Sequence, residues 1–183
     1  MKNSAKLIPS VALKILLGVG IAALLCGRAN AQGSGSAQGP ANAQGLVTQP
    51  NLSLAMAKTI AEAALGACQA KGYHTAVAVV DRAGQVMVIL RDEQSSAQNA
   101  EMARRKAYTA RMFRTTTSEF QKRTADPAYA AQRDLPDILA LGGGAPIQAG
   151  NETVGAVGSA GSTQEQDDAC AKAGIAKVAN LLK

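Results

Sequence analysis

The sequence predicts an α+β fold in which helices pack on an antiparallel β-sheet of about five strands. Three observations predict it. Apolar residues recur at helical spacing in the segment that opens the domain. Two pairs of short runs rich in Val and Ala are each joined by a Gly-containing turn, which is typical of hairpins. The predicted order is helix, two strands, helix, three strands and helix, without the β-α-β alternation of a dinucleotide-binding sheet.

The first 31 residues are predicted to be a secretory signal peptide and not part of the fold. Lys2 and Lys6 precede a long apolar run, and Ala29-Asn30-Ala31 supplies the small-x-small pattern of a cleavage site. An uncleaved membrane anchor is the alternative, but residues 15–26 fall short of the roughly 20 apolar residues that span a bilayer. We therefore expect a periplasmic or secreted protein, without stable membrane insertion once the signal is removed.

Most of the net positive charge of the chain lies in this predicted signal peptide. The whole chain carries a net charge of +6, whereas residues 32–183 hold 15 basic and 13 acidic residues, a net of +2. The basic balance is therefore poor evidence for nucleic acid as a partner, and we expect none. Residues 32–50 are rich in Gly, Ser, Ala, Gln and Pro and are predicted to be a flexible linker. Residues 51–183 suffice for one domain with a core.

The elements of this domain can be placed in order. The first helix begins at a cap residue, Asn51 or Ser53, and ends at Gly72. A hairpin, a second helix, an irregular stretch, a short strand, a second hairpin and a last helix follow. Their expected ranges are 75–81 and 85–91 for the first hairpin, 95–113 for the second helix, 115–136 for the irregular stretch with a short helix near 118–122, 138–141 for the short strand, 146–149 and 152–157 for the second hairpin, and 163–182 for the last helix.

A Gly/Ser-rich segment leads into the last helix. Ser162 and Glu165 have the spacing of a capping box. Together with Gly161 and Thr163 they form a helix start whose free amides and dipole attract a carboxylate or phosphate. A tight strand-to-helix connection that binds no ligand is the alternative. Acid/base candidates for a small organic acid bound nearby are Asp81, Glu165 and Asp168.

The helix at 95–113 carries a second set of candidate residues. Two neighbouring stripes of this helix hold Met102, Lys106 and Thr109 on one, and Tyr108 and Met112 on the other. Oxygen donors of Tyr or Thr can ligate ferric haem, and the cations Lys106, Arg105 and Arg111 can pair with its propionates. An ordinary amphipathic helix with a basic outer face is the alternative.

The histidine and cysteine content limits the metal chemistry. His74, the only histidine, lies at the start of the first strand, where it is either an iron ligand or an ordinary strand-end residue. Cys68 and Cys170 lie in two predicted helices near the ends of the domain. They either form a disulfide, if those helices pack together in an oxidising compartment, or are two small buried hydrophobic residues.

Several segments together resemble the GlcG/HbpS-like family of small haem-binding proteins. They are residues 77–84 (VAVVDRAG), 106–110 (KAYTA), 142–147 (GGGAPI) and 154–168, in this order across residues 52–182. The resemblance implies a profilin-like layout, with the sheet sandwiched by helices, and assembly into a homo-oligomer. It also implies binding of haem or iron where subunits meet. It places the iron ligand at Thr109, with His74 as the alternative used by histidine-ligated relatives.

Three hypotheses for function follow. The first is an exported protein that binds or buffers haem or iron at a subunit interface. The second is an enzyme or sensor for small organic acids of the glycolate or carbonyl type. The third is an oligomeric accessory protein without catalytic activity. The sequence contains no Gly-x-Ser-x-Gly nucleophile motif, which disfavours a serine hydrolase of that type. We favour binding over catalysis and keep the enzyme hypothesis as the alternative.

Overall fold

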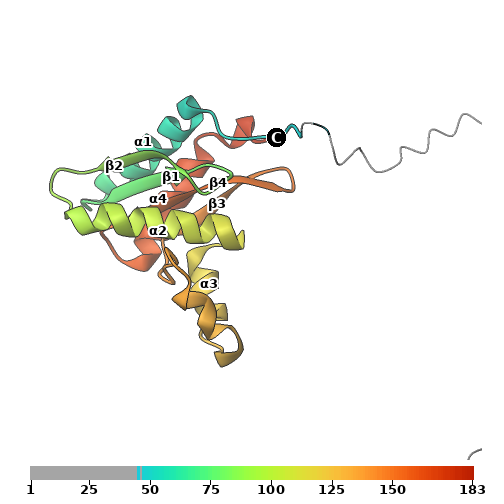
Figure 1. Cartoon of the computed structure of the whole chain (residues 1–183). Coiled ribbons are helices and arrows are strands. Elements are labelled where there is room, and N and C mark those ends of the chain that lie inside the picture. Colours follow the sequence, from blue (N-terminus) through green and yellow to red (C-terminus); the bar gives the residue numbers. More distant parts are fainter. Residues whose placement is uncertain (1–44, 46) are drawn as a thin grey trace, which may run out of the picture. The chain divides into compact units, whose positions relative to one another are not determined.

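The computed structural model describes residue 45 and residues 47–183 (Figure 1). The predicted signal peptide and most of the predicted linker lie outside the described residues. Among the residues that are described, no helix is both long and apolar enough to cross a membrane. The elements are α1 (Leu54–Gln69), β1 (Ala76–Val80), β2 (Val86–Arg91), α2 (Ala97–Phe113), α3 (Thr117–Arg123), η1 (Pro127–Asp134), β3 (Gly144–Ala149), β4 (Glu152–Ala160), α4 (Gln164–Ala176) and η2 (Ala179–Leu181).

The predicted α+β class is confirmed. Within the described residues the sheet has four antiparallel strands in the order β2-β1-β4-β3. Both predicted hairpins are present, β1 with β2 and β3 with β4, while β1 and β4 pair with each other at the centre of the sheet. The sheet thus joins the two hairpins through a long-range pairing that no turn signal in the sequence marks.

The strand expected at 138–141 does not form, so the sheet has four strands where about five were expected. The Ile138 carbonyl accepts a hydrogen bond from Arg105, and the Leu139 amide donates to the Thr109 hydroxyl. These backbone groups pair with side chains of α2 instead of a neighbouring strand. The apolar residues that suggested a strand belong to a loop that α2 holds in place.

Helices cover both faces of the sheet (Figure 1), and the two faces differ in side-chain size. Val77 and Val79 of β1 point towards α1 and α4 and lie in the larger hydrophobic core. Ala76, Ala78 and Val80 point towards α2, where the core consists mostly of alanine. Since β1 is buried along its whole length, alternate residues of one strand supply both cores.

The alanine-rich face brings α2 very close to the sheet. A Cβ atom built on Gly158 of β4 would lie 2.1 Å from the carbonyl oxygen of Ala103 and 2.6 Å from the amide nitrogen of Ala107. A Cβ on Gly144 of β3 would lie 2.4 Å from the Lys106 carbonyl oxygen. Only glycine fits at these two points, because the backbone of α2 occupies the space of a side chain.

The N-cap of α1 agrees with the sequence prediction, whereas the N-cap of α4 differs from it. Ser53 caps α1, accepting a hydrogen bond from the Met56 amide. The capping box expected at Ser162 and Glu165 is absent, because the N-cap of α4 is Thr163, whose hydroxyl accepts from the Gln166 amide. Ser162 instead donates its hydroxyl to the Asp167 carboxylate. The structure therefore corrects the predicted cap by one residue.

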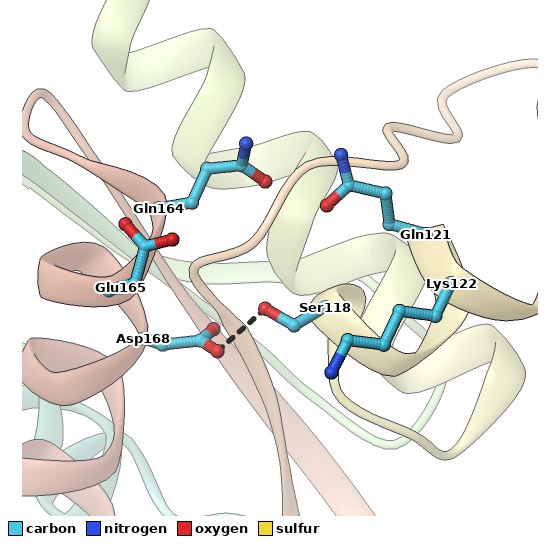
Figure 2. A pocket seen from close by; sticks show the side chains of 6 residues that line it. All are labelled: Ser118, Gln121, Lys122, Gln164, Glu165 and Asp168. Carbon is cyan, nitrogen blue, oxygen red and sulfur yellow. Dashed lines mark hydrogen bonds between the residues drawn. The ribbon is translucent and has the colours of Figure 1, made fainter.

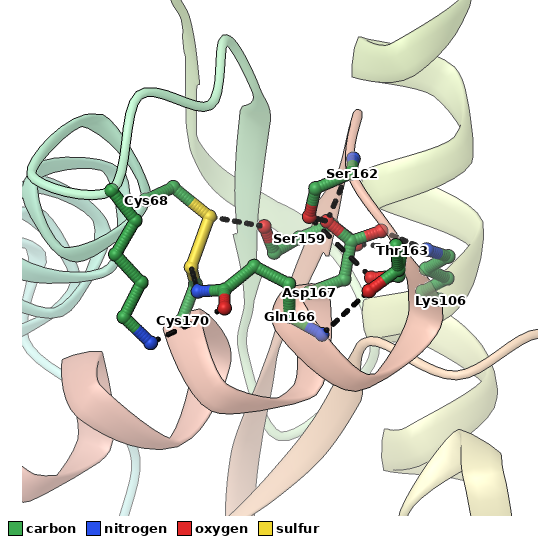
Figure 3. Close-up of a disulfide and its surroundings, with 9 residues drawn as sticks. Cys68, Lys106, Ser159, Ser162, Thr163, Gln166, Asp167 and Cys170 are labelled. Atoms are coloured by element: carbon green, nitrogen blue, oxygen red, sulfur yellow. Dashed lines mark hydrogen bonds and ion pairs between the residues drawn. A yellow bond between two sulfur atoms is a disulfide. The ribbon is translucent and has the colours of Figure 1, made fainter.

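A disulfide joins Cys68 of α1 to Cys170 of α4, with the two Cα atoms 5.6 Å apart (Figure 3). The sequence leaves this pairing open, because it depends on the two helices lying side by side. They do so on one face of the sheet, where a Cβ on Gly174 of α4 would lie 2.5 Å from the carbonyl oxygen of Ile60 in α1. The covalent link thus holds together the two helices that cover the larger core.

Candidate functional site

The middle of α2 fixes the loop that follows η1. Arg104 forms an ion pair with Asp137, Nη2 to Oδ1 2.5 Å. Arg105 donates to the Ile138 carbonyl at 2.6 Å, and the Thr109 hydroxyl accepts from the Leu139 amide at 2.9 Å. Asp137 has a left-handed backbone, with φ of 65°, which short polar residues tolerate better than others. Three side chains of one helix therefore hold three consecutive loop residues.

This loop and α2 enclose an apolar pocket of about 380 Å³. We call it the Tyr108 pocket; its lining residues are Tyr108, Met112, Phe113, Leu135, Pro136, Asp137 and Ile138. Leu135 is 51% exposed and Met112 is 37% exposed, although both are apolar. The pocket thus combines an apolar wall, a phenol and a thioether, and it opens to the surface.

The turn between β1 and β2 supports Tyr108 and Met112. Gly84 has φ of +81°, and a Cβ built there would lie 2.7 Å from the Met112 methyl carbon and 3.0 Å from the Tyr108 ring. Gly84 is therefore needed for its backbone conformation, and a side chain there would press on the Tyr108 ring and displace the flexible end of Met112. Two of the predicted haem contacts, Tyr108 and Met112, therefore lie against the β1–β2 turn.

Lys106 points away from this pocket into the interior. It is 2% exposed and forms an ion pair with the equally buried Asp167, Nζ to Oδ2 2.8 Å (Figure 3). Its ammonium also donates to the Ser159 carbonyl at 3.0 Å. The Ser159 hydroxyl in turn lies 3.8 Å from the Cys68 sulfur. In this structure the charge of Lys106 is already paired inside the chain. Its predicted role in binding the haem propionates stays a prediction.

Thr109 is also buried, with none of its surface exposed. Its hydroxyl donates to the Arg105 carbonyl at 2.8 Å and accepts from the Leu139 amide. Binding iron through this oxygen would require at least the bond to Leu139 to be given up. Tyr108, one residue earlier, lines the pocket directly.

The glycine-rich joint has its amides occupied by side chains of the same chain. Gly142 donates to Gln164 at 2.7 Å, Gly143 to Asp168 at 2.6 Å and Gly144 to the Thr117 hydroxyl at 2.8 Å. At the start of α4, the Ser162 amide donates to Asp167. A carboxylate of the chain itself therefore stands where the sequence suggested an external anion.

Beside this joint, a pocket of about 290 Å³ separates α3 from α4. Figure 2 shows Ser118, Gln121 and Lys122 of α3 facing Gln164, Glu165 and Asp168 of α4, with Ser118 donating to Asp168 at 2.7 Å. Two carboxylates and one lysine line it, a charge balance unfavourable for an acidic ligand. Asp81, the third predicted acid/base residue, lies in the β1–β2 turn, where its Oδ1 accepts from two turn amides.

His74 lies apart from Thr109. Its Nδ1 is 2.9 Å from the Asp92 carboxylate. Hydrogen bonds from the Gln69 side chain and the Gln94 backbone amide hold the pKa of Asp92 below its ordinary value, and His74 adds to this effect. The His74 carbonyl lies beside Gly161 and Asn99, near the start of α2. No cluster of three or more potential metal-ligating His, Cys, Asp or Glu side chains occurs in the described part of the chain.

The structure thus brings Tyr108 and Met112 together, holds Arg105 and Thr109 behind the pocket wall, and places Lys106, His74 and the α4 start elsewhere. Sequence reasoning missed the wall formed by Leu135, Pro136 and Ile138. An apolar Leu-Pro pair inside a polar, irregular stretch is the signal that could have revealed it.

Comparisons with known proteins agree with this fold. A family model described as "Haem degrading protein HbpS-like" matches residues 52–176. A double mutant of HbpS from Streptomyces reticuli is 38% identical, covering 76% of this chain and 97% of its own, with a TM-score of 0.70. A PduOC:heme complex is 25% identical, covering 69% of this chain and 94% of its own, with a TM-score of 0.63.

A curated relative from Citrobacter freundii, described as an uncharacterised 15.0 kDa protein, is 29% identical over 119 residues, which are 63% of this chain and 84% of the relative. The matched family segment extends from just before α1 to the end of α4, and so includes the whole sheet, α2 and the Tyr108 pocket. This chain belongs to the HbpS-like family of haem-degrading proteins.

Proposed function

We propose that this protein is exported and binds or buffers haem in the Tyr108 pocket, with a second copy of the chain completing the site. The observation that carries the proposal is the pocket itself, an apolar wall with a phenol and a thioether at its surface. A family relative crystallised with heme supports it. The disulfide between α1 and α4 is in keeping with export to an oxidising compartment.

The donor set of the pocket fits haem. A tyrosine phenolate ligates ferric haem in some proteins, and a methionine thioether does so in others. We propose Tyr108 as the iron ligand in preference to Thr109, whose hydroxyl is bonded on both sides. When bound, haem would supply an iron centre and a large flat apolar surface. The chain's own contribution is to position Tyr108 and Met112 side by side against Gly84.

The second copy follows from the shape of the ligand. Haem has two apolar faces, and most of a bound ligand's surface is normally buried. A pocket of about 380 Å³ that opens to the surface covers only part of such a ligand. Leu135 and Met112, half-exposed at its mouth, would be buried by a partner.

Hemin titration tests the proposal. Protein purified from expression of the full chain is expected to give a saturable Soret shift at micromolar concentration. Tyr108→Phe removes only the phenol oxygen and should change the Soret position and weaken binding by about tenfold, the equivalent of ~1.4 kcal/mol. Tyr129→Phe, at an exposed tyrosine of η1 outside the pocket, is the matched control and should behave as the parent.

Two results would contradict this assignment. The absence of a saturable shift in the parent would remove haem binding altogether. A changed spectrum in Thr109→Ala alongside an unchanged one in Tyr108→Phe would return the ligand role to Thr109. The mass of the hemin-loaded protein measures whether a second copy is recruited, and its N-terminal residue shows where the signal is cut.

A further inference from the structure

Another pocket is lined in part by the β1–β2 turn that contains Gly84. It measures about 310 Å³ and is lined by Gln49, Asn51, Arg82, Ala83 and Arg111. Arg82 belongs to the β1–β2 turn and Arg111 to the last turn of α2. We call it the Arg111 pocket. Two guanidinium groups from distant parts of the sequence therefore line one small cavity.

Arg111 has no partner for its charge among residues 45 and 47–183. It takes part in no ion pair or hydrogen bond there, and its Nε atom is buried without a hydrogen-bond partner. Burial lowers the pKa of Arg111, and the nearby positive charges of Arg114 and Arg82 lower it further; Asp81 acts weakly in the opposite direction. A partly desolvated cation beside two other cations is unfavourable unless an anion joins it.

The neighbouring carboxylates are committed elsewhere. Asp81 accepts hydrogen bonds from the amides of Ala83 and Gln85 through Oδ1, which stabilises its own turn. Glu152 pairs with Arg82, Oε2 to Nη1 2.5 Å. The guanidinium groups of Arg82, Arg111 and Arg114 thus outnumber the carboxylates of Asp81 and Glu152 by one. Arg111 is the member of this group that lines the pocket without a carboxylate partner in the described residues.

A neutral donor completes the lining. The Asn51 Oδ1 accepts from the backbone amides of Leu52 at 2.9 Å and Arg82 at 3.1 Å. With the oxygen so engaged, the side-chain nitrogen of Asn51 is left as a hydrogen-bond donor at the pocket. Guanidinium and amide donors in one cavity are the usual partners of carboxylate and phosphate oxygens.

We propose that the Arg111 pocket binds an oxyanion, a carboxylate or a phosphate, through the guanidinium group of Arg111. Arg82, which already pairs with Glu152 and donates to the Pro50 carbonyl, is the second cation of the lining. The site stands on its own geometry and does not depend on haem. Its anion can come from two sources, a free small acid or a propionate of haem held in the Tyr108 pocket, since Ala83 of the Arg111 pocket directly precedes the Gly84 on which Tyr108 and Met112 rest.

The test compares the parent full-chain protein with two variants. Arg111→Gln removes the charge, and Arg111→Lys keeps the charge but loses the bidentate guanidinium donors. Lys58→Gln, at an exposed lysine of α1, controls for the loss of one surface cation. Thermal unfolding is followed with sodium phosphate, with sodium glycolate and with sodium chloride at equal ionic strength. Hemin and hemin dimethyl ester, whose propionates are blocked, are titrated in parallel.

Phosphate or glycolate should raise the Tm of the parent and of Lys58→Gln above the chloride value, and Arg111→Gln should bind at least about tenfold more weakly. Without an added anion, Arg111→Gln should unfold at a Tm no lower than the parent, because repulsion from Arg82 and Arg114 is relieved. If only hemin binding depends on Arg111, and the ester abolishes that dependence, the anion is a propionate.

Equal binding of phosphate, glycolate and hemin by the parent and Arg111→Gln would overturn the proposal. So would a clear drop in the anion-free Tm of Arg111→Gln that Arg111→Lys restores without restoring any anion response, because Arg111 would then be a structural residue. A phosphate response without any Soret shift would overturn haem binding alone and leave the oxyanion site supported.

Discussion

Replacing Lys106 with methionine is expected to lower the free energy of unfolding by about 3–5 kcal/mol. The substitution leaves Asp167 as a buried carboxylate, 2% exposed, without its cation. Ser162 still donates to this carboxylate through its amide and hydroxyl, but these neutral donors do not compensate the charge. The loss can be measured by urea unfolding, with the slope of the transition serving to check two-state behaviour.

The matched control is Lys58→Met, which makes the same chemical change at an exposed helical lysine and should shift stability by less than about 0.5 kcal/mol. The double variant Lys106→Met/Asp167→Leu should recover part of the loss, because no unpaired charge remains buried. A single-variant loss below about 1 kcal/mol would show that water reaches Asp167 and that the pair is not truly buried.

Removing the disulfide is the second large effect. Cys68 and Cys170 are separated by 102 residues in the sequence, and cross-linking a loop of about 100 residues is worth about 4.7 kcal/mol on the chain-entropy estimate. We expect the variant with both cysteines replaced by alanine to lose most of this stability in guanidinium unfolding. The bond encloses the whole sheet, so its removal releases nearly the entire domain in the unfolded state.

Reduction provides an independent comparison for this variant. A reducing agent should lower the stability of the parent to that of the double alanine variant and should leave the variant itself unchanged. An equal response of both proteins to the reductant, or a loss below about 1 kcal/mol, would contradict the assigned role. Since Ser159 contacts Cys68 and also binds Lys106, the two losses are not expected to add independently.

The sequence predicts the helices and hairpins well because their signals are local. Helical spacing predicts α1, and turn residues predict both hairpins, each within a few residues of the observed bounds. The strand at 138–141 is wrong because a short apolar run has the same pattern in a strand and in a buried loop. What decides between them is Arg105 and Thr109, about thirty residues earlier in the chain.

The site could be predicted only in part for the same reason. Helical spacing identifies Tyr108 and Met112 as candidates. Lys106 lies in the same segment but points inward, because its partner Asp167 lies on a helix 61 residues further along the chain. The cap of α4 moves from Ser162 to Thr163 because that same carboxylate binds Ser162. The Arg111 pocket is invisible in the sequence, since it joins a turn, a helix end and residues before the first helix.

The close approach of α2 to the sheet has a consequence for how this chain can vary. Ala103, Ala107 and Ala110 face the strands, and the backbone of α2 lies so close to Gly158 and Gly144 that there is no room for larger side chains. Tyr108, Arg111 and Met112 lie outside that face and line the two pockets. Substitutions should therefore be tolerated at the outer positions of α2 and not at the positions that face the sheet. Ligand preference can then diversify at the outer positions while the backbone of the helix stays unchanged.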